Sequence, residues 1–205
     1  MKKGLSISDL CFLDWGPLSF SVNPAECVGL RGASGSGKTL LLRAIADLDE
    51  HSGTISLDET PCNSLSGPDW RRRVAMLPAE SSWWRDTVGE HFPEELEESR
   101  LLVEQLGFDS GKVFDWEISR LSVGERQRLA LVRLLQHKPR VLLLDEPTAN
   151  LDEKSTELVE QVISKYRSNE SVPVLWVTHS REQLERVSSR SLILENKKLS
   201  EEVAG

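Results

Sequence analysis

The residues of this chain best suited to chemistry lie first in a glycine-rich turn, GASGSGKT at 32–39. The turn fits the phosphate-loop pattern GxxxxGK followed by Ser or Thr, with an apolar segment before it and an amphipathic one after it. Its glycines let backbone N–H groups approach phosphate oxygens, and the following helix points its positive end at the same anion. We expect Lys38 to reach the β- and γ-phosphates of a nucleotide and Thr39 to place its hydroxyl on Mg²⁺. A flexible Gly/Ser turn is the alternative, which the flanking elements disfavour.

A second group of reactive side chains ends the stretch RVLLLDEP at 140–147. Its apolar run predicts a buried strand, and the carboxylates Asp145 and Glu146 follow directly. Ligands of parallel sheets bind beyond the carboxyl ends of the strands, where both groups would lie beside the glycine-rich turn. Asp145 would hold Mg²⁺ through its water shell, and Glu146 would orient or deprotonate the water that attacks the γ-phosphate. Taken alone, the pair also fits a solvated turn or a helix cap.

Two further segments could contact a phosphate. Ser122 and Glu125 have capping-box spacing for a helix over 122–136, and Ser122 and Gly124 stand at its N-terminus, which can also hold an anion. A capped core helix is the simpler interpretation of that segment. His179 follows an apolar strand at 173–177, where a γ-phosphate contact competes with a core histidine or a cap.

Short apolar runs alternate with amphipathic ones along the chain, and this alternation predicts an α/β fold. The expected strands are 26–30, 54–57, 71–77, 141–144, 173–177 and 191–195, and the expected helices are 39–48, 94–108, 122–136, 153–167 and 181–187. Residues 79–119 are rich in Trp and Glu, and we place a small helical subdomain there.

Composition narrows the function. The 205 residues suffice for one sizeable core. Because 33 Asp and Glu outnumber 25 Lys and Arg, giving a net charge of −8, we expect no general nucleic-acid-binding surface. The three cysteines show no CxxC spacing, so neither a disulfide framework nor a zinc site is indicated and a reducing compartment is expected. No apolar run approaches the roughly 18 residues of a membrane span, so we expect a cytosolic chain without a signal peptide or direct membrane insertion.

The order GASGSGKT, LSVGERQR, VLLLDEPTANLD and VTHS resembles that of the ATP-binding cassette (ABC) ATPases over nearly the whole chain. The resemblance implies one P-loop NTPase domain of ABC type spanning 1–205, with ATP and Mg²⁺ as ligands. It also implies a mostly parallel central sheet and an antiparallel β portion in an ATP-binding core, 1–78 and 120–205, beside the helical subdomain. Two such domains would form a head-to-tail homodimer with two ATP molecules between them.

The resemblance assigns roles to the residues of the first, third and fourth motifs. The Walker A loop that binds ATP would comprise Gly32, Ala33, Ser34, Gly35, Ser36, Gly37, Lys38 and Thr39, continuing to Leu40. Thr39 and the Walker B carboxylate Asp145 would hold the metal. Lys38 would serve catalysis together with Glu146, the catalytic base, and His179, the switch histidine.

The signature motif, LSVGERQR, would act on the other subunit. Ser122 and Gly124 would contact the γ-phosphate held by that subunit, and Asp152 would lie at the dimer interface near the opposite site. Family members usually stack the adenine on an aromatic residue ahead of the Walker loop, and both Phe12 and Trp15 are candidates.

Three positions depart from the family pattern. Ala79 stands where a glutamine normally senses the γ-phosphate and the metal, so coupling of hydrolysis to partner movement would be altered. Val123 replaces a signature glycine and adds bulk where the neighbouring nucleotide approaches. Leu40 replaces a second hydroxyl and removes one phosphate hydrogen bond, typically worth about 1 kcal/mol.

The resemblance implies transport, because family members mostly energise separate membrane-spanning subunits. Residues 83–92 correspond to the region that in the family docks a membrane partner's cytoplasmic helix, although their two adjacent tryptophans also fit core packing. The stretches 132–153 and 174–184 are most similar to small bacterial cassettes associated with iron or other metal export. We thus expect an ATPase held at the inner face of the membrane through its partner.

Two other function classes are the alternatives. The first is a low-turnover, nucleotide-gated structural or regulatory cassette, and the second is the ATPase of a soluble DNA-repair or ribosome-associated machine.

Overall fold

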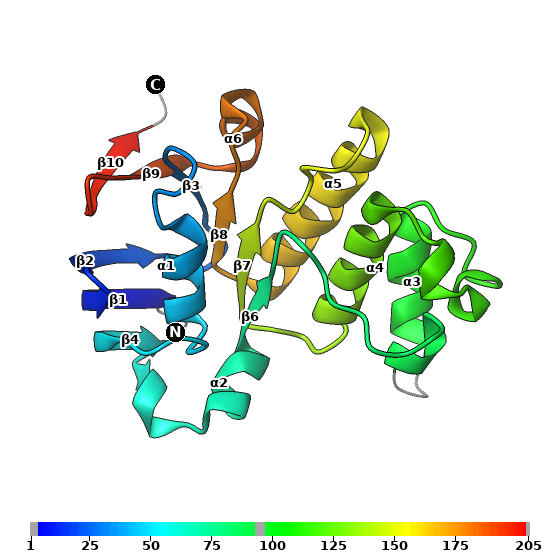
Figure 1. The fold of residues 1–205 in the computed structure, drawn as a ribbon, viewed down its shortest axis with the longest axis horizontal. Coiled ribbons are helices and arrows are strands. Elements are labelled where there is room, and N and C mark those ends of the chain that lie inside the picture. The colour runs from blue at the N-terminus through cyan, green and yellow to red at the C-terminus, as the bar shows by residue number, and fades with distance from the viewer. Residues whose placement is uncertain (1–3, 93–96, 204–205) are drawn as a thin grey trace.

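The computed structural model describes residues 4–92 and 97–203, and its strands form two sheets on either side of helix α1 (Figure 1). The antiparallel sheet has the order β2 (Trp15–Val22), β1 (Leu5–Phe12), β4 (Ser52–Leu57), β5 (Thr60–Pro61). The second sheet has the order β10 (Lys198–Val203), β9 (Arg190–Glu195), β3 (Cys27–Arg31), β8 (Val174–Val177), β7 (Val141–Asp145), β6 (Val74–Leu77), and only β10 pairs antiparallel in it. The mostly parallel central sheet and the antiparallel β portion are therefore confirmed.

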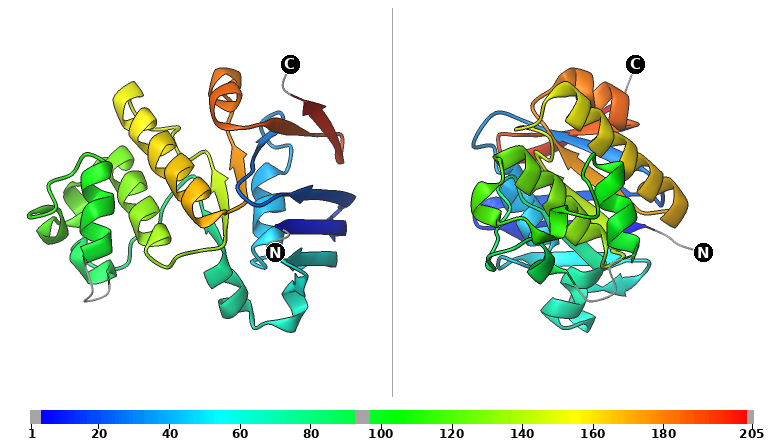
Figure 2. Two further views of the ribbon diagram at one scale, coloured as in Figure 1. Left: turned by 180° about the vertical axis from the view of Figure 1, so that it is seen from behind. Right: turned by 90° about the vertical axis from the view of Figure 1, so that its right-hand side faces the viewer.

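The helices cover the central sheet and extend beyond it. They are α1 (Lys38–Ile45), α2 (Gly67–Arg73), α3 (Glu97–Gln105), α4 (Val123–Leu135), α5 (Glu153–Glu170) and α6 (Arg181–Val187), with 3₁₀ turns η1 (Cys62–Ser64), η2 (Gly89–His91), η3 (Val113–Asp115) and η4 (Ile118–Arg120). Helix α3 packs against α4 and α5 at one end of the molecule (Figure 2). Across the two described ranges, no helix combines the length and apolar character needed to cross a membrane.

Strand β7 is buried on both faces and divides the interior into two apolar clusters. Leu143 joins the cluster that includes α1 and the antiparallel sheet, whereas Leu142 and Leu144 join the cluster that includes α4 and α5. Adjacent residues of a strand point to opposite faces, so an uninterrupted apolar run is needed to serve both clusters. Asp145 is the first polar residue of the strand, and it lies at the carboxyl edge of the sheet.

Four expected element boundaries are wrong by three residues. Helix α5 runs on to Glu170 instead of ending at 167, and α3 ends at Gln105 instead of 108; the other two concern α2 and α1. Arg71 to Arg73 end helix α2 instead of beginning a strand, because Ser66 caps this helix, Pro68 stands in its first turn and its arginines lie near its negative end. The expected helix at 39–48 ends at Ile45, since Asp47 takes a left-handed conformation with φ +56°.

The remaining expectations for 79–119 have two outcomes. Residues 94–96 of the helix expected at 94–108 lie outside the described part of the chain, and α3 forms the rest up to Gln105. The subdomain boundary at 119 stays a prediction, because Val103 of α3 shares its apolar cluster with Leu129 of α4 and Val159 of α5.

Trp70 fixes the position of α2 against the end of α1. Its indole is fully buried, and its Nε1 donates to the carbonyl oxygen of Ile45 over 2.9 Å. This bond satisfies one of the carbonyl groups that a helix leaves unpaired at its C-terminus.

We expect Trp70→Phe to lower the free energy of unfolding by about 2 to 4 kcal/mol, since it leaves a buried carbonyl unpaired and a small cavity. Urea unfolding followed by circular dichroism measures the change. Trp84→Phe is the matched control, because Trp84 is 67% exposed. A loss of stability no larger than that of the control would contradict the role given to Trp70.

Candidate functional site

The loop at 32–37 joins β3 to α1 and leaves the start of the helix open to a ligand. Gly37 is the N-cap of α1, with φ +79° and no side-chain cap. A Cβ at this position would come within 2.9 Å of the Trp15 indole, so only glycine fits both the conformation and the space. The first N–H groups of α1 and its dipole therefore offer a site for an anion.

Lys38 begins α1 and turns its side chain back onto the loop. Its Nζ donates to the carbonyl oxygens of Gly32 (2.9 Å) and Ala33 (3.0 Å), and the residue is only 7% exposed. Ser36 Oγ is buried in the same loop without a hydrogen-bond partner. A buried ammonium group beside an unsatisfied hydroxyl fits a loop that binds phosphate.

Thr39 and Asp145 meet at the base of this loop. Thr39 Oγ1 donates to Asp145 Oδ2 over 2.7 Å, although the two residues are 106 positions apart. The carboxylate belongs to a residue that is 4% exposed. Hydroxyl and carboxylate oxygens are the ligands that Mg²⁺ prefers, so this pair fits a magnesium ion held together with phosphate oxygens.

Glu146 lies beyond Asp145 in a left-handed conformation, with φ +48°, which is uncommon for residues other than glycine. Its Oε1 is buried and lies 3.3 Å from His179 Nε2, an ion-pair distance without hydrogen-bond geometry. Burial raises the pKa of Glu146 above its ordinary value of 4.5; His179 and Lys38 oppose that shift, and Asp145 adds to it. A carboxylate with a raised pKa next to an imidazole is suited to general-base catalysis.

These side chains line one cavity of about 270 Å³. The lining consists of Ser34, Gly35, Ser36, Gly37, Lys38, Thr39, Leu40, Ala79, Asp145, Glu146 and His179. The structure thus brings together the predicted phosphate-binding, metal-binding and catalytic residues, with Gly32 and Ala33 attached to them through Lys38. Leu40 also packs against the apolar cluster around α1, so its side chain serves the core.

The three remaining predicted site residues lie around a separate hollow of about 340 Å³, whose lining includes Ser122, Gly124 and Asp152. Ser122 caps α4, and the reciprocal bonds of a capping box with Glu125 are present. A Cβ on Gly124 would come within 2.9 Å of the Asn150 carbonyl oxygen, so glycine allows the start of α4 to approach the segment that ends at Asp152. Asp152 in turn caps α5 by accepting from the Ser155 N–H over 2.7 Å.

The two aromatic candidates for adenine stacking differ in accessibility. Phe12 is 3% exposed and belongs to the main apolar cluster. Trp15 is half-buried, lies against Gly37 of the loop and stacks on Phe12 with a ring separation of 6.3 Å. Of this pair, Trp15 is the more exposed and is the one that contacts the loop at Gly37.

Gln127 is a connecting residue that the sequence reasoning missed. Its Nε2 donates to the carbonyl oxygen of Pro78 over 2.9 Å, and the residue is 3% exposed. The bond ties α4 to the segment that carries Ala79 into the cavity. The sequence pattern that could have identified Gln127 is its place on the apolar face of the predicted helix, one turn before Leu131.

Comparisons with known proteins agree with this geometry. Residues 16–149 match the family described as ABC transporter. The chain is 35% identical over 183 residues to the aliphatic sulfonates import ATP-binding protein SsuB 2 of Agrobacterium fabrum, covering 87% of this chain and 69% of that protein. It is 31% identical over 177 residues to the probable iron export ATP-binding protein FetA of Escherichia coli, covering 82% and 78%.

A solved structure of an ATP-binding subunit of an ABC transporter has the same fold, with a TM-score of 0.86 at 23% identity over 98% of this chain and 90% of that one. The cassette architecture expected from the motifs is therefore confirmed. This chain belongs to the ABC transporter family, as an ATPase subunit that uses ATP and Mg²⁺.

Proposed function

We propose that the chain works as a head-to-tail homodimer on the cytoplasmic side of a membrane, where it energises a membrane-spanning partner. The observation that carries the proposal is the separation of the predicted ATP-binding residues into two hollows of one chain. In a head-to-tail pair, Ser122 and Gly124 of one copy cover the phosphate loop of the other, so each ATP is enclosed from both sides. Neither hollow alone surrounds a nucleotide.

The phosphate-loop half binds the nucleotide. Residues 32–40 contact the phosphates through backbone N–H groups, and Lys38 supplies the positive charge. Thr39 and Asp145 hold Mg²⁺, which neutralises charge on the phosphate oxygens when bound. Trp15 stacks on the adenine, since its indole adjoins the loop while Phe12 is buried.

Glu146 takes the proton of the attacking water in this proposal. Its burial raises the pKa of the carboxylate above its ordinary value, which makes it a stronger base for the proton of the attacking water. His179 lies close enough to orient the carboxylate and is itself exposed, so it can reach a γ-phosphate.

The other half is held by internal hydrogen bonds within the single chain. The Ser122 hydroxyl donates a hydrogen bond to the Glu125 carboxylate. The Asp152 carboxylate accepts one from the Ser155 N–H and so caps α5. Hydrogen bonding to the Ser155 N–H lowers the pKa of Asp152, which keeps this cap charged at neutral pH. Val123 is 50% exposed between the contact residues and presents its bulk to the incoming nucleotide.

We expect Glu146→Gln to slow ATP turnover by about 10² to 10⁴ while leaving ATP binding intact, because only the base is lost. Lys38→Ala is the binding control and should weaken ATP affinity by about 10- to 100-fold, the equivalent of 1.5–3 kcal/mol. Phosphate release and equilibrium binding of a fluorescent ATP analogue measure the two effects. Near wild-type turnover in the Gln variant would remove Glu146 as the base.

The same assay tests the homodimer. The rate per subunit should rise with protein concentration, because the second hollow must come from another copy. A substantial rate that does not depend on concentration down to the lowest dilutions would contradict a site shared between copies.

Ala79 is the point where this cavity departs most from the family pattern. It lines the cavity, but its methyl group cannot bond to a phosphate, a metal or water. We expect Ala79→Gln to raise the hydrolysis rate several-fold, because the amide can reach the metal shell from this position. Ala79→Leu has a similar volume without hydrogen-bonding groups and is the control. An equal rate in both variants would mean that the missing amide does not limit the reaction.

A groove of about 480 Å³ between the core and α4 is the proposed docking surface for the membrane partner. Leu48 (45% exposed) and Trp84 (67% exposed) provide apolar surface, and Arg71, Arg72 and Arg133 provide positive charge. This charge contrasts with the net −8 of the chain. The groove therefore suits a short helix with an apolar face and acidic residues.

His91 fixes the shape of the tryptophan segment at this groove. Its Nε2 accepts from the backbone N–H groups of Trp84 and Arg85 (3.1 Å each), and its Nδ1 donates to the Thr87 carbonyl oxygen over 2.9 Å. The neutral ring satisfies all three bonds. Burial lowers the pKa of His91 below 6.5; the bond to Thr87 opposes this shift, and nearby Arg133 adds to it.

We expect the protein to lose stability as the pH falls below 6.5, the ordinary pKa of histidine. Below pH 6.5 the unfolded chain binds a proton at this histidine that the folded chain does not bind. The stability that neutral His91 contributes is therefore fully present above pH 6.5, and it is lost as the pH falls toward the lower pKa of the folded state. Urea unfolding between pH 7.5 and 5.5 measures the slope. His91→Gln should flatten it. Burial also lowers the pKa of His137, a second histidine at the groove, so His137→Gln measures its separate share of the slope. A slope unaffected by His91→Gln would contradict this assignment.

Iron or other metal export is the more specific form of the proposal. The similarity to FetA, a probable iron export protein, supports it. The similarity to SsuB 2, which is named for import and is 35% identical, favours the opposite direction of transport. The membrane partner would set the substrate and direction. A low-turnover regulatory cassette is the second candidate, favoured by Ala79 and Val123 and disfavoured by the intact Glu146 with its raised pKa.

A further inference from the structure

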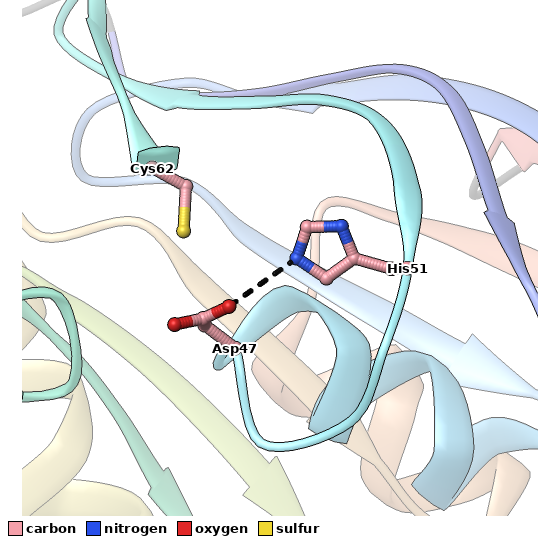
Figure 3. Close-up of side chains that lie close together, drawn as sticks. All are labelled: Asp47, His51 and Cys62. Carbon is pink, nitrogen blue, oxygen red and sulfur yellow. Dashed lines mark ion pairs between the residues drawn. The ribbon is translucent and has the colours of Figure 1, made fainter. Parts of the chain in front are cut away.

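Asp47, His51 and Cys62 come together in a cluster (Figure 3), and none of the three lines the phosphate-loop cavity or the docking groove. Asp47 follows the end of α1, His51 precedes β4, and Cys62 begins η1. Their potential ligand atoms all lie within 4.8 Å of one another. Neither the proposed ATPase cycle nor the docking surface uses this cluster.

The histidine of this cluster lacks the partners that a buried imidazole normally has. Both ring nitrogens of His51 are buried and make no hydrogen bond. The nearest acceptor is Asp47 Oδ1, 3.6 Å from Nε2, which is too long for a hydrogen bond. An unpaired buried polar group is costly, and at least one nitrogen of this ring is therefore available to a ligand.

The backbone holds Asp47 in place. Asp47 stands directly after the C-cap of α1 with φ +56°, where glycine is the usual residue. The N–H of Asp47 donates to Ala44 O (3.0 Å), and that of Leu48 to Arg43 O (2.9 Å). Its carboxylate is therefore directed from a fixed helix end toward the histidine, as Figure 3 shows.

Cys62 supplies a thiol in an apolar setting. The residue is 6% exposed, and burial raises the pKa of its thiol to about 11, with Asp47 adding to the shift and Arg71 opposing it. The free thiol is thus protonated at neutral pH. A cation that binds the sulfur must displace this proton, which makes the affinity depend on pH.

We propose that Asp47, His51 and Cys62 form a binding site for a divalent transition-metal ion of the zinc class. Thiolate, imidazole and carboxylate together form a donor set that suits Zn²⁺ and Co²⁺, whereas Mg²⁺ and Ca²⁺ prefer oxygen ligands. A tetrahedral ion would hold such atoms about 3.5 Å apart, so the three side chains must close by roughly 1 Å. Asp47, the most exposed of the three, leaves room for water as the fourth ligand.

The site has a physical route to the docking groove. Arg71 Nη1 lies 3.7 Å from Asp47 Oδ2 and donates to the Asp47 carbonyl oxygen over 2.8 Å. A metal ion that takes the carboxylate weakens the first contact, while the second still anchors the guanidinium. Because Arg71 lines the groove, a metal ion that takes the Asp47 carboxylate leaves the positive charge of Arg71 less neutralised at the groove.

Cobalt binding by the full chain tests the proposal. Reduced, chelator-treated protein is titrated with Co²⁺ in excess Mg²⁺, so that oxygen sites such as Thr39 and Asp145 are filled. We expect one Co²⁺ per chain with a thiolate-to-cobalt charge-transfer band and displacement by one equivalent of Zn²⁺. Cys62→Ala should abolish the band, and His51→Gln should weaken Co²⁺ binding by at least about tenfold.

Cys11→Ala is the matched control, because Cys11 is a free cysteine outside the cluster, and it should bind as the wild type does. Circular dichroism of each variant establishes that the chain is folded. A folded wild type without the band, or a band of full strength in both folded cluster variants, would overturn the proposal. A band that is lost in Cys11→Ala and kept in Cys62→Ala would also overturn it, since the ligand thiol would lie elsewhere.

Discussion

The hydrogen bond between Thr39 and Asp145 joins the first turn of α1 to the end of β7, and the cavity proposed to bind and hydrolyse ATP is built around it. Its geometry follows from the parallel sheet. Strand β7 needs apolar residues on both faces, so its carboxylates can appear only where the strand leaves the interior. Because β3 and β7 run parallel, with β8 between them, the phosphate loop reaches the same edge. The two acidic residues are tolerated there because a lysine, a hydroxyl and an imidazole surround them.

Helix α1 links three parts of the molecule through its two ends. Its uncapped N-terminus faces the phosphate loop, and its eight residues extend roughly 12 Å. The Ile45 carbonyl at its other end accepts from buried Trp70, and Asp47 follows in a left-handed conformation. A movement of this short helix on nucleotide binding would therefore reach α2 and the docking groove without further intermediates.

The helical region is connected to the same cavity by single polar contacts. Gln127 bonds to the chain just before Ala79, and the guanidinium of Arg133 lies over the rings of Trp83 and Trp84 (4.4 and 4.7 Å). These contacts span the region between the docking groove and the cavity. Helix α4 is hydrogen-bonded to this segment on both sides of Ala79, through Gln127 to Pro78 and through Arg133 Nη2 to the Ser82 carbonyl oxygen over 2.9 Å.

The sequence by itself determined the parts of the protein whose physical signal is local. The glycine-rich turn, the apolar run of β7 and the capping box at Ser122 each lie within a few residues, so loop, strand and helix start were predictable from spacing alone. The strands β1, β2, β5 and β10 are not predictable in this way. In β1 the alternation of Leu5 and Ile7 is broken by a register shift before Leu10. The strand predicted at 71–77 begins only at Val74, because the Ser66 cap holds Arg71 to Arg73 in α2. Only the tertiary structure showed that Phe12 is buried while Trp15 lies beside the glycine-rich loop, divided the predicted ATP-binding residues between two hollows, and placed Cys62 beside Asp47 and His51. The physical reason is that burial, and the meeting of side chains from separate elements, depend on how sheets and helices pack, which no local spacing records.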